Sequence, residues 1–239
     1  QAAGTPFYSS AAEAILDQIR PFRGYRSISV VETRYNSNYH SMQVSGKRII
    51  TRGNEVNVSY TFSRNLTDNQ NDRSAAPQNS YDIRADYARA ALDRRHILSI
   101  NYIYEIPFFR KQNSLTGKFL GGWQASGIVT FNSGLPFTAT TSGYDPAGLG
   151  ILPPPFTVGR PNLLCDPDVG GSKTFESFFN TACFSLTPNS GTTGLQTRPG
   201  NSPRGVITGP NTTRFDVTLS KNIRFGEKMR LQLRAEGFN

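Results

Sequence analysis

Few residues in this chain have the type and spacing that catalysis or metal binding requires. The only two histidines, His40 and His96, are far apart in the sequence and do not have the spacing of metal ligands. We interpret each as a polar residue near the start of a strand. Residues 148–150 (GLG) are too short a match to indicate a nucleotide-binding loop. The sequence therefore predicts no catalytic, cofactor or metal site, and we expect no enzymatic activity.

The two cysteines, Cys165 and Cys183, are the other candidate pair. They flank a stretch that contains Phe175, Phe178 and Phe179. We predict a disulfide between them, which would close a loop of about 19 residues and contribute about 3 kcal/mol in the chain-entropy treatment. The alternative is two reduced thiols. A bridge suits an oxidising compartment but does not by itself prove one.

The composition indicates which kind of scaffold must position these residues. The 239 residues (26.4 kDa) are 36% hydrophobic and include 22 glycines and 15 prolines. This composition disfavours a helical bundle and favours strands joined by turns and long loops. No run of 18 apolar residues occurs, so no transmembrane helix is predicted. Strands can still cross a membrane, because alternate residues of such strands are polar.

Apolar and polar residues alternate with the period of a β-strand in six segments. In residues 55–63, for example, Val56, Val58 and Tyr60 share one face. Tight turns are expected at residues 51–54 and 225–228. Long loops are expected at residues 64–93 and 133–212, and residues 1–38 are expected to be irregular, with a short helix near 11–19 and a possible strand at 26–31. The six predicted strands, within a region spanning residues 39–239, are 40–50, 55–63, 95–106, 123–132, 214–224 and 229–238.

The connections between these segments alternate between short and long. In an up-and-down antiparallel sheet, the short connections then fall at one end and both long ones at the other, as in outer-membrane barrels. The strands are also long enough to cross hydrocarbon at a tilt, and aromatic residues crowd their ends. A soluble β-sandwich alternates in the same way, but its strands are usually shorter. The pattern therefore favours an all-β, antiparallel transmembrane β-barrel, present here as a partial barrel of about six long strands.

The formal net charge of +9 could indicate nucleic acid or another anionic partner. The basic residues are scattered over strands and loops, so we expect no nucleic-acid binding. Lys47, Arg230 and Arg234 lie on polar strand faces, which would line a barrel lumen. We interpret residues 93–96 (DRRH) as a charged rim where a loop enters a strand. Lipopolysaccharide phosphates are the expected external partner of other basic groups.

Several stretches also resemble TonB-dependent outer-membrane receptors, most closely the Oar-like group with a carboxypeptidase-regulatory-like N-terminal domain. The likeness covers most of residues 25–239. Each motif is weakly specific alone, but their order along the chain matches that group. The motifs are 37–44 (SNYHSMQV), 58–66 (VSYTFSRNL), 93–96 (DRRH) with 102–108 (YIYEIPF), 121–124 (GGWQ) with 133–138 (SGLPFT), 160–162 (RPN), 179–184 (FNTACF), 216–222 (DVTLSKN) and 231–239 (LQLRAEGFN).

The resemblance implies a location in the outer membrane of a Gram-negative bacterium and uptake of an unidentified nutrient. It also implies a 22-stranded, plugged barrel driven by TonB through a plug domain. The chain lacks a recognisable plug, begins at Gln1 and ends within an alternating run, so we expect a fragment containing a later part of the barrel. The alternative is a structural or adhesive β protein whose chains assemble by pooling strands through their unpaired edges.

Overall fold

The computed structural model describes most of the chain, in two compact units. The units are Gln1–Tyr35 and Asn36–Asn239. In the first unit Gln18 is helical, and the other described residues form bends, a turn or irregular backbone. The rest of the expected helix at 11–19, and half of the expected strand at 26–31, lie outside the described residues. The described residues are 18, 21–23, 25, 28, 30–51, 53–69, 77–109, 112, 114–141, 159–186, 199–225 and 229–239.

Six long strands of the second unit form one antiparallel sheet. Their order is β1-β2-β4-β5-β10-β11, so each long strand pairs with the long strands before and after it in the chain. This order confirms the predicted up-and-down sheet. The strands are β1 (Ser37–Thr51), β2 (Asn54–Thr67), β4 (His96–Glu105), β5 (Trp123–Asn132), β10 (Thr212–Phe225) and β11 (Met229–Gly237).

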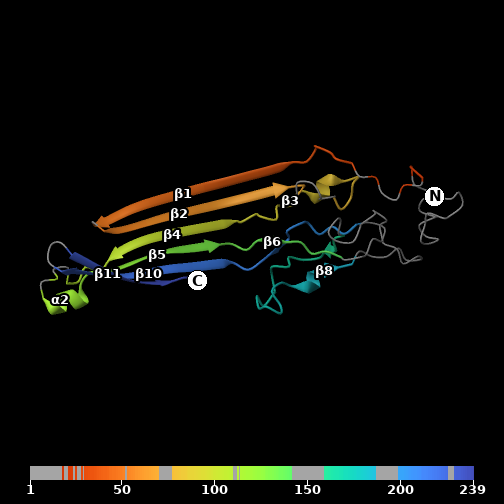
Figure 1. Cartoon of the computed structure of the whole chain (residues 1–239). Helices are drawn as coiled ribbons and strands as arrows, with labels where there is room; N and C mark the ends of the chain where they lie inside the picture. The colour runs from red at the N-terminus through yellow and green to blue at the C-terminus, as the bar shows by residue number, and fades with distance from the viewer. Residues whose placement is uncertain are drawn as a thin grey trace, which may run out of the picture. The chain divides into compact units, whose positions relative to one another are not determined.

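The connections divide between two ends of the sheet (Figure 1). The β1–β2 hairpin closes at Thr51↔Asn54, where Gly53 has the positive φ of 92° that this turn requires. Helix α2 (Leu115–Leu120) lies in the β4–β5 connection at this same end, which we call the turn end. The β2–β4 and β5–β10 connections lie at the opposite, loop end. As the alternation of short and long connections predicted, the two long connections lie together at one end of the sheet.

The strand register separates the sheet into an apolar and a polar face. Residues directly opposite one another in antiparallel strands lie on the same face. The row Val44↔Tyr60, Tyr60↔Leu98 and Leu98↔Phe131 shows the apolar face continuing across four strands. The intervening residues, such as Ser59 opposite Ser45 and Ser99, lie on the polar face. Period-two patterning in the sequence thus becomes a continuous two-faced surface.

Ionisable residues are distributed unequally between these two faces. The four carboxylates of the long strands all have polar-face registers: Glu55, Glu105, Asp216 and Glu236. Basic groups with apolar-face registers lie near the strand ends: His40, Arg64 and His96 at the loop end, and Arg48 and Lys221 at the turn end. The described strands therefore place no carboxylate on the apolar face.

Many large apolar side chains of the sheet are exposed. Val44, Phe215 and Leu233 are 56%, 49% and 55% exposed, respectively. Among the described residues, the buried hydrophobic side chains are Ala88, Ala90, Cys183 and Ile207, none of which belongs to a long strand. A soluble sandwich would cover this apolar face with a second sheet. The exposed apolar face instead fits a hydrocarbon environment. In the described part of the chain, no helix has the length and hydropathy needed to span a membrane.

The regions expected as loops, 64–93 and 133–212, contain several short elements and are not uniformly irregular. Strand β2 extends to Thr67, beyond its expected end at 63. The added elements have two to four residues each, too few to show a sequence period. They are η1 (Ile83–Asp86), β3 (Ala88–Arg89), β6 (Pro136–Phe137) paired with β9 (Ile207–Thr208), β7 (Asn162–Leu163) paired with β8 (Phe184–Ser185), and η2 (Thr181–Cys183).

Candidate functional site

The strongest candidate site is the assembly formed by the two long connections at the loop end. Its centre is the fully buried carboxylate of Asp86, the last residue of η1. Arg160 Nη1 lies 2.5 Å from Asp86 Oδ1, and Arg204 Nη2 lies 2.7 Å from Oδ2. The backbone N–H of Gln78 also donates to Oδ2, at 2.9 Å. A residue of the β2–β4 connection thus binds two arginines of the β5–β10 connection.

The same two arginines also donate to backbone carbonyls. Arg160 Nε donates to the carbonyl oxygen of Ser202 at 2.7 Å, and Arg204 Nη1 donates to that of Asp68 at 3.1 Å. Burial lowers the pKa of Arg160, while the charge and hydrogen bond of Asp86 act in the opposite direction. Two buried cations around one carboxylate tolerate burial only because these additional partners are present. The cluster therefore fixes the two connections relative to each other.

A second buried carboxylate, Asp93, links β2 to the loop assembly. Its Oδ1 accepts the backbone N–H of Asn65 at 2.7 Å, and its Oδ2 accepts Nε of Arg89 at 3.0 Å. Arg89 Nη1 also donates to Thr208 Oγ1 at 3.0 Å. The N–H of Thr208 in turn donates to Asp168 Oδ1 at 3.0 Å. This chain of polar contacts fixes strand β9 and residues 166–168 against the loop end of β2.

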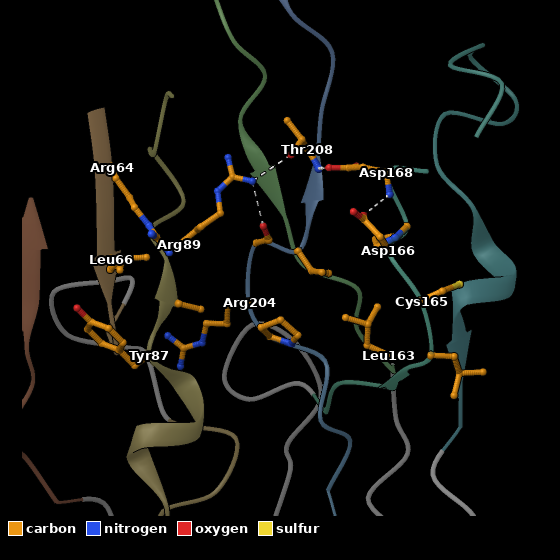
Figure 2. A pocket seen from close by; sticks show the side chains of 16 residues that line it. Arg64, Leu66, Tyr87, Arg89, Leu163, Cys165, Asp166, Asp168, Arg204 and Thr208 are labelled. Carbon is orange, nitrogen blue, oxygen red and sulfur yellow. Dashed lines mark hydrogen bonds between the residues drawn. The ribbon is translucent and has the colours of Figure 1, made fainter. Parts of the chain in front are cut away.

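A cavity of about 730 Å³ lies among these contacts. Figure 2 shows Arg64 and Leu66 of β2 on one side of it, and Leu163 and Cys165 on another. Its walls combine cationic, anionic, aromatic and aliphatic groups. It is therefore suited to an amphipathic or carbohydrate-like ligand more than to a purely apolar one. Its remaining lining residues are Tyr87, Ala88, Arg89, Leu164, Asp166, Pro167, Asp168, Pro203, Arg204, Gly205, Val206 and Thr208.

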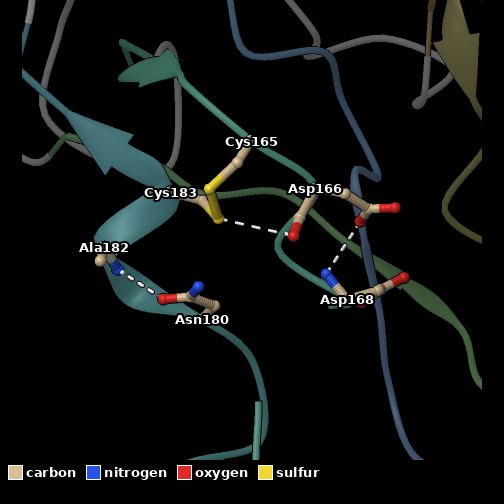
Figure 3. Close-up of a disulfide and its surroundings, with 6 residues drawn as sticks. All are labelled: Cys165, Asp166, Asp168, Asn180, Ala182 and Cys183. Atoms are coloured by element: carbon tan, nitrogen blue, oxygen red, sulfur yellow. Dashed lines mark hydrogen bonds between the residues drawn. A yellow bond between two sulfur atoms is a disulfide. The ribbon is translucent and has the colours of Figure 1, made fainter. Parts of the chain in front are cut away.

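One wall of this cavity is held by a cross-linked segment (Figure 3). A disulfide joins Cys165 to Cys183 in the structure, across a sequence separation of 18. Next to it, β7 and β8 pair through Asn162↔Ser185 and Leu163↔Phe184. The bridge and the short strand pair constrain the same segment. The intervening residues 166–182 thus form a closed projection beside the cavity.

The polar face of the sheet has a second hollow, of about 450 Å³. Glu55, Asn101, Asp216 and Arg234 contribute polar groups to it. Glu55 pairs with Lys47 at 2.8 Å, and Arg234 pairs with Glu236. These ion pairs lower the free-energy cost of holding charged side chains on this face, away from bulk water. The polar face is therefore suited to a hydrated or polar-filled lumen.

The histidines are not brought together as a pair. His40 lies opposite Arg64, whereas His96 Nδ1 is 2.8 Å from the hydroxyl of Tyr60. Among the described residues, no group of three or more potential ligands is placed to hold a metal ion. Residues 148–150 lie outside the described residues. The prediction of no enzymatic activity stays a prediction.

The interpretation of residues 93–96 as a charged rim needs correction at Asp93. Asp93 is only 1% exposed, because its carboxylate holds Asn65 and Arg89. Arg94 donates to the carbonyl oxygen of Ser133 at 2.8 Å. The guanidinium of Arg95 lies over the ring of Phe62, 5.8 Å from its centroid. Asp93 is therefore an internal cross-link between loop and strand, whereas Arg94 and Arg95 are half-buried where the loop enters β4.

Sequence reasoning does not find the cluster around Asp86. Arg160 occurs in one of the resemblance motifs, but neither Asp86 nor Arg204 stands out from its neighbours. Asp86 and Arg204 are separated by 118 positions in the chain, so no local spacing relates them. The only available signal is the presence of charged residues inside regions expected to be loops. Such residues are usually solvated, which makes that signal weak.

Comparison with known proteins identifies the family. No curated protein and no solved structure shows significant similarity to the chain. The sequence profile of the family described as outer membrane beta barrel domain matches residues 1–239. This match agrees with the long antiparallel strands, the two-faced sheet and the separation of turns from long loops. The family places the protein in the bacterial outer membrane, in contact with membrane lipid. The chain belongs to the outer membrane β-barrel domain family.

Proposed function

We propose that the chain supplies barrel strands and external loops to a TonB-dependent receptor that takes up a nutrient across the outer membrane. The observation that supports this most directly is the ordered loop assembly at one end of a two-faced sheet. An external capture surface needs side chains held in fixed positions, and the Asp86 cluster provides that rigidity. The cavity beside it offers a mixed polar and apolar lining for a ligand.

Transport in this proposal requires parts outside the sheet of six long strands and the short strand β3. Strands β1 and β11 are the two edges of the described sheet, and no pairing joins them. Further strands are needed to close a barrel around a plug, and energy would reach the plug from TonB. The polar strand faces would line the lumen, while the loop assembly would receive the ligand from outside. Siderophores, oligosaccharides and peptides all remain candidate ligands.

The loop end of the apolar face is also placed to meet lipopolysaccharide. His40 and Arg64 lie directly opposite each other there, and both are exposed. Outer-membrane barrels have their long loops on the extracellular side. This pair would then face the phosphates of the outer leaflet, with Arg64 at the border between that surface and the cavity of about 730 Å³. Arg64→Gln should reduce the lipopolysaccharide that co-purifies with the protein, and equal retention in the variant would contradict this assignment.

The first test of the receptor proposal is the intact mass of the native polypeptide, taken from the outer-membrane fraction under denaturing conditions. A receptor with plug and closed barrel predicts a mass several times 26.4 kDa. The detergent-solubilised protein should also retain the periplasmic domain of TonB on an affinity column. A mass near 26.4 kDa would reject the proposal. The open strand edges would then favour the alternative, in which several chains pool strands for a structural or adhesive role.

A further inference from the structure

Helix α2 at the turn end has an exposed apolar side that the barrel function described above does not use. Ser114 caps its N-terminus by accepting the N–H of Gly117 at 3.1 Å, and Gly121 ends it. Leu115 and Phe119 are 86% and 79% exposed. They are four residues apart, so they project from the same side of the helix. No described residue covers this side of α2, so the two side chains form an exposed apolar strip along the helix.

A lysine of the sheet holds this helix at the edge of the apolar face. Lys221 has an apolar-face register, opposite Trp123 and Leu233. Its ammonium donates to the carbonyl oxygens of Phe119, at 2.8 Å, and Gly121. It also lies 5.1 Å from the centroid of the Trp123 ring. The carbonyl end of α2 is thereby tied to the side of the sheet that faces lipid.

A second cation connects the helix with the aromatic edge of the sheet. Lys118 Nζ lies 5.6 Å from the ring centroid of Phe225, the last residue of β10. Phe225 is 46% exposed and shares the apolar face with Met229. Arg48 of β1 has an apolar-face register at the same end of the sheet. We define the turn-end rim as Leu115, Lys118, Phe119, Trp123 and Phe225; Lys221 is buried beneath them and holds α2 in place.

We propose that the turn-end rim is a seat for anionic phospholipid headgroups of the inner leaflet of the outer membrane. In it, α2 lies in the membrane interface, with Leu115 and Phe119 in the acyl region and Lys118 near lipid phosphate. Two observations select lipid as the occupant. The rim is continuous with the apolar face of the barrel sheet, and the long strands place no carboxylate on that face. Short turns of such barrels face the periplasm, where the inner leaflet is the adjoining lipid.

The depth of α2 in the bilayer can be measured with a bimane fluorophore on an introduced cysteine. Leu115→Cys and Phe119→Cys are made separately in the full-length protein, after replacement of any other free thiol, and reconstituted in phosphatidylethanolamine–phosphatidylglycerol vesicles. Both probes should be quenched more strongly by lipids carrying a doxyl group at carbon 5 than at carbon 12, and weakly by aqueous iodide. Phe175→Cys is the matched control, because Phe175 is 100% exposed at the loop end. It should respond to iodide and not to lipid.

Two results would overturn the interfacial position of α2. Strong iodide quenching of both the residue 115 and residue 119 probes would show that the helix lies in water. Weak quenching by both iodide and lipid would show that protein, such as a second copy or a periplasmic partner, covers it. Two independent labelling positions guard against one substitution that disturbs the local fold.

The charge of the headgroup is tested at the same probe. Quenching of bimane at position 119 by doxyl-phosphatidylglycerol is compared with quenching by doxyl-phosphatidylcholine. Lys118→Gln should lower the local preference for phosphatidylglycerol about fivefold, the effect of one basic residue near an anionic surface. Lys173→Gln removes an equal charge from the projection at the loop end and should change nothing. An unchanged preference in Lys118→Gln would overturn the headgroup assignment. This inference depends on the outer-membrane barrel and not on TonB, so it can fail or succeed independently of the transport proposal.

Discussion

At the residue scale, the most consequential group is the carboxylate of Asp86. Its two arginine partners come from a different connection, and all three side chains are nearly excluded from solvent. Removing one partner from a buried ionic cluster costs far more than breaking an exposed pair, because the remaining charges stay buried without compensation. Asp86 is therefore expected to control the stability of the loop assembly.

Asp86→Asn should destabilise the loop assembly by about 3–5 kcal/mol, since it leaves two buried guanidinium groups without an anion. Hydrogen exchange should show this as faster exchange at the backbone N–H groups of Leu163 and Ser202, with the strand amides unchanged. Glu176→Gln is the matched control, because Glu176 is an exposed carboxylate of the β5–β10 connection, which also carries Leu163 and Ser202. Equal exchange in Asp86→Asn and the unmodified protein would contradict the structural role given to Asp86.

The disulfide provides a second prediction at this scale. Protease digestion of the non-reduced native protein should yield one peptide pair linked through Cys165 and Cys183, which separates on reduction. Replacing both with serine should lower the stability of residues 165–183 by about 3 kcal/mol, because the unfolded segment regains loop entropy. Two separately alkylated peptides, recovered without prior reduction, would show that the thiols are free in the native protein.

At the scale of elements, atoms of β4 and β10 lie very close to the backbone of one glycine of β5, Gly127. A side chain at Gly127 would place its Cβ 2.8 Å from the hydroxyl oxygen of Tyr102 and in steric overlap with the carbonyl oxygen of Asp216. Gly127 lies opposite Tyr102 in β4 and Val217 in β10. The absent side chain lets the ring of Tyr102 lie across the neighbouring strand. Gly127 thus permits the packing of three consecutive strands.

Gly127→Ala should therefore destabilise the folded protein by about 1–3 kcal/mol through overpacking. Gly46→Ala is a close control, because Gly46 has the same apolar-face register and a Cβ at this position would have no neighbouring atom within 4 Å. That control should be neutral or slightly stabilising. Urea unfolding of both variants in vesicles gives the comparison. Equal midpoints for the two variants would show that the contact with Tyr102 is easily relieved.

At the scale of the whole molecule, the two faces of the sheet assign each strand residue to lipid or lumen. Val129 and Thr130 are neighbours in β5, with similar burial but opposite faces. Val129→Arg should cost about 2–4 kcal/mol of folding free energy in the bilayer, because a cation would enter hydrocarbon. Thr130→Arg should cost much less. Heat-modifiable gel mobility of the membrane-inserted protein measures the folded fraction, and equal loss in both variants would argue against this assignment of faces.

The sequence alone determined the long strands, their faces and their order. Period-two alternation is local, so residues 123–132 could be recognised from their own composition, and the structure gives the same bounds for β5. The lengths of the connections then predicted which turns share an end. The outer-membrane setting followed from strand length and loop asymmetry, and the family match supports it. These properties depend on neighbours along the chain, which a sequence displays directly.

Only the tertiary structure decided how the regions expected as loops fold and where their charges lie. Strands of two residues, such as β3 and β9, have no detectable period, and their pairing depends on backbone partners far along the chain. Asp86 contacts Arg204 across 118 positions of the sequence, and Lys221 contacts Phe119 of α2 across 102. A charged residue has the same local sequence signature whether it is solvated or buried. The cost of burial is compensated by ion-pair and hydrogen-bond partners that are distant in the sequence, and only the tertiary structure shows which residues these are.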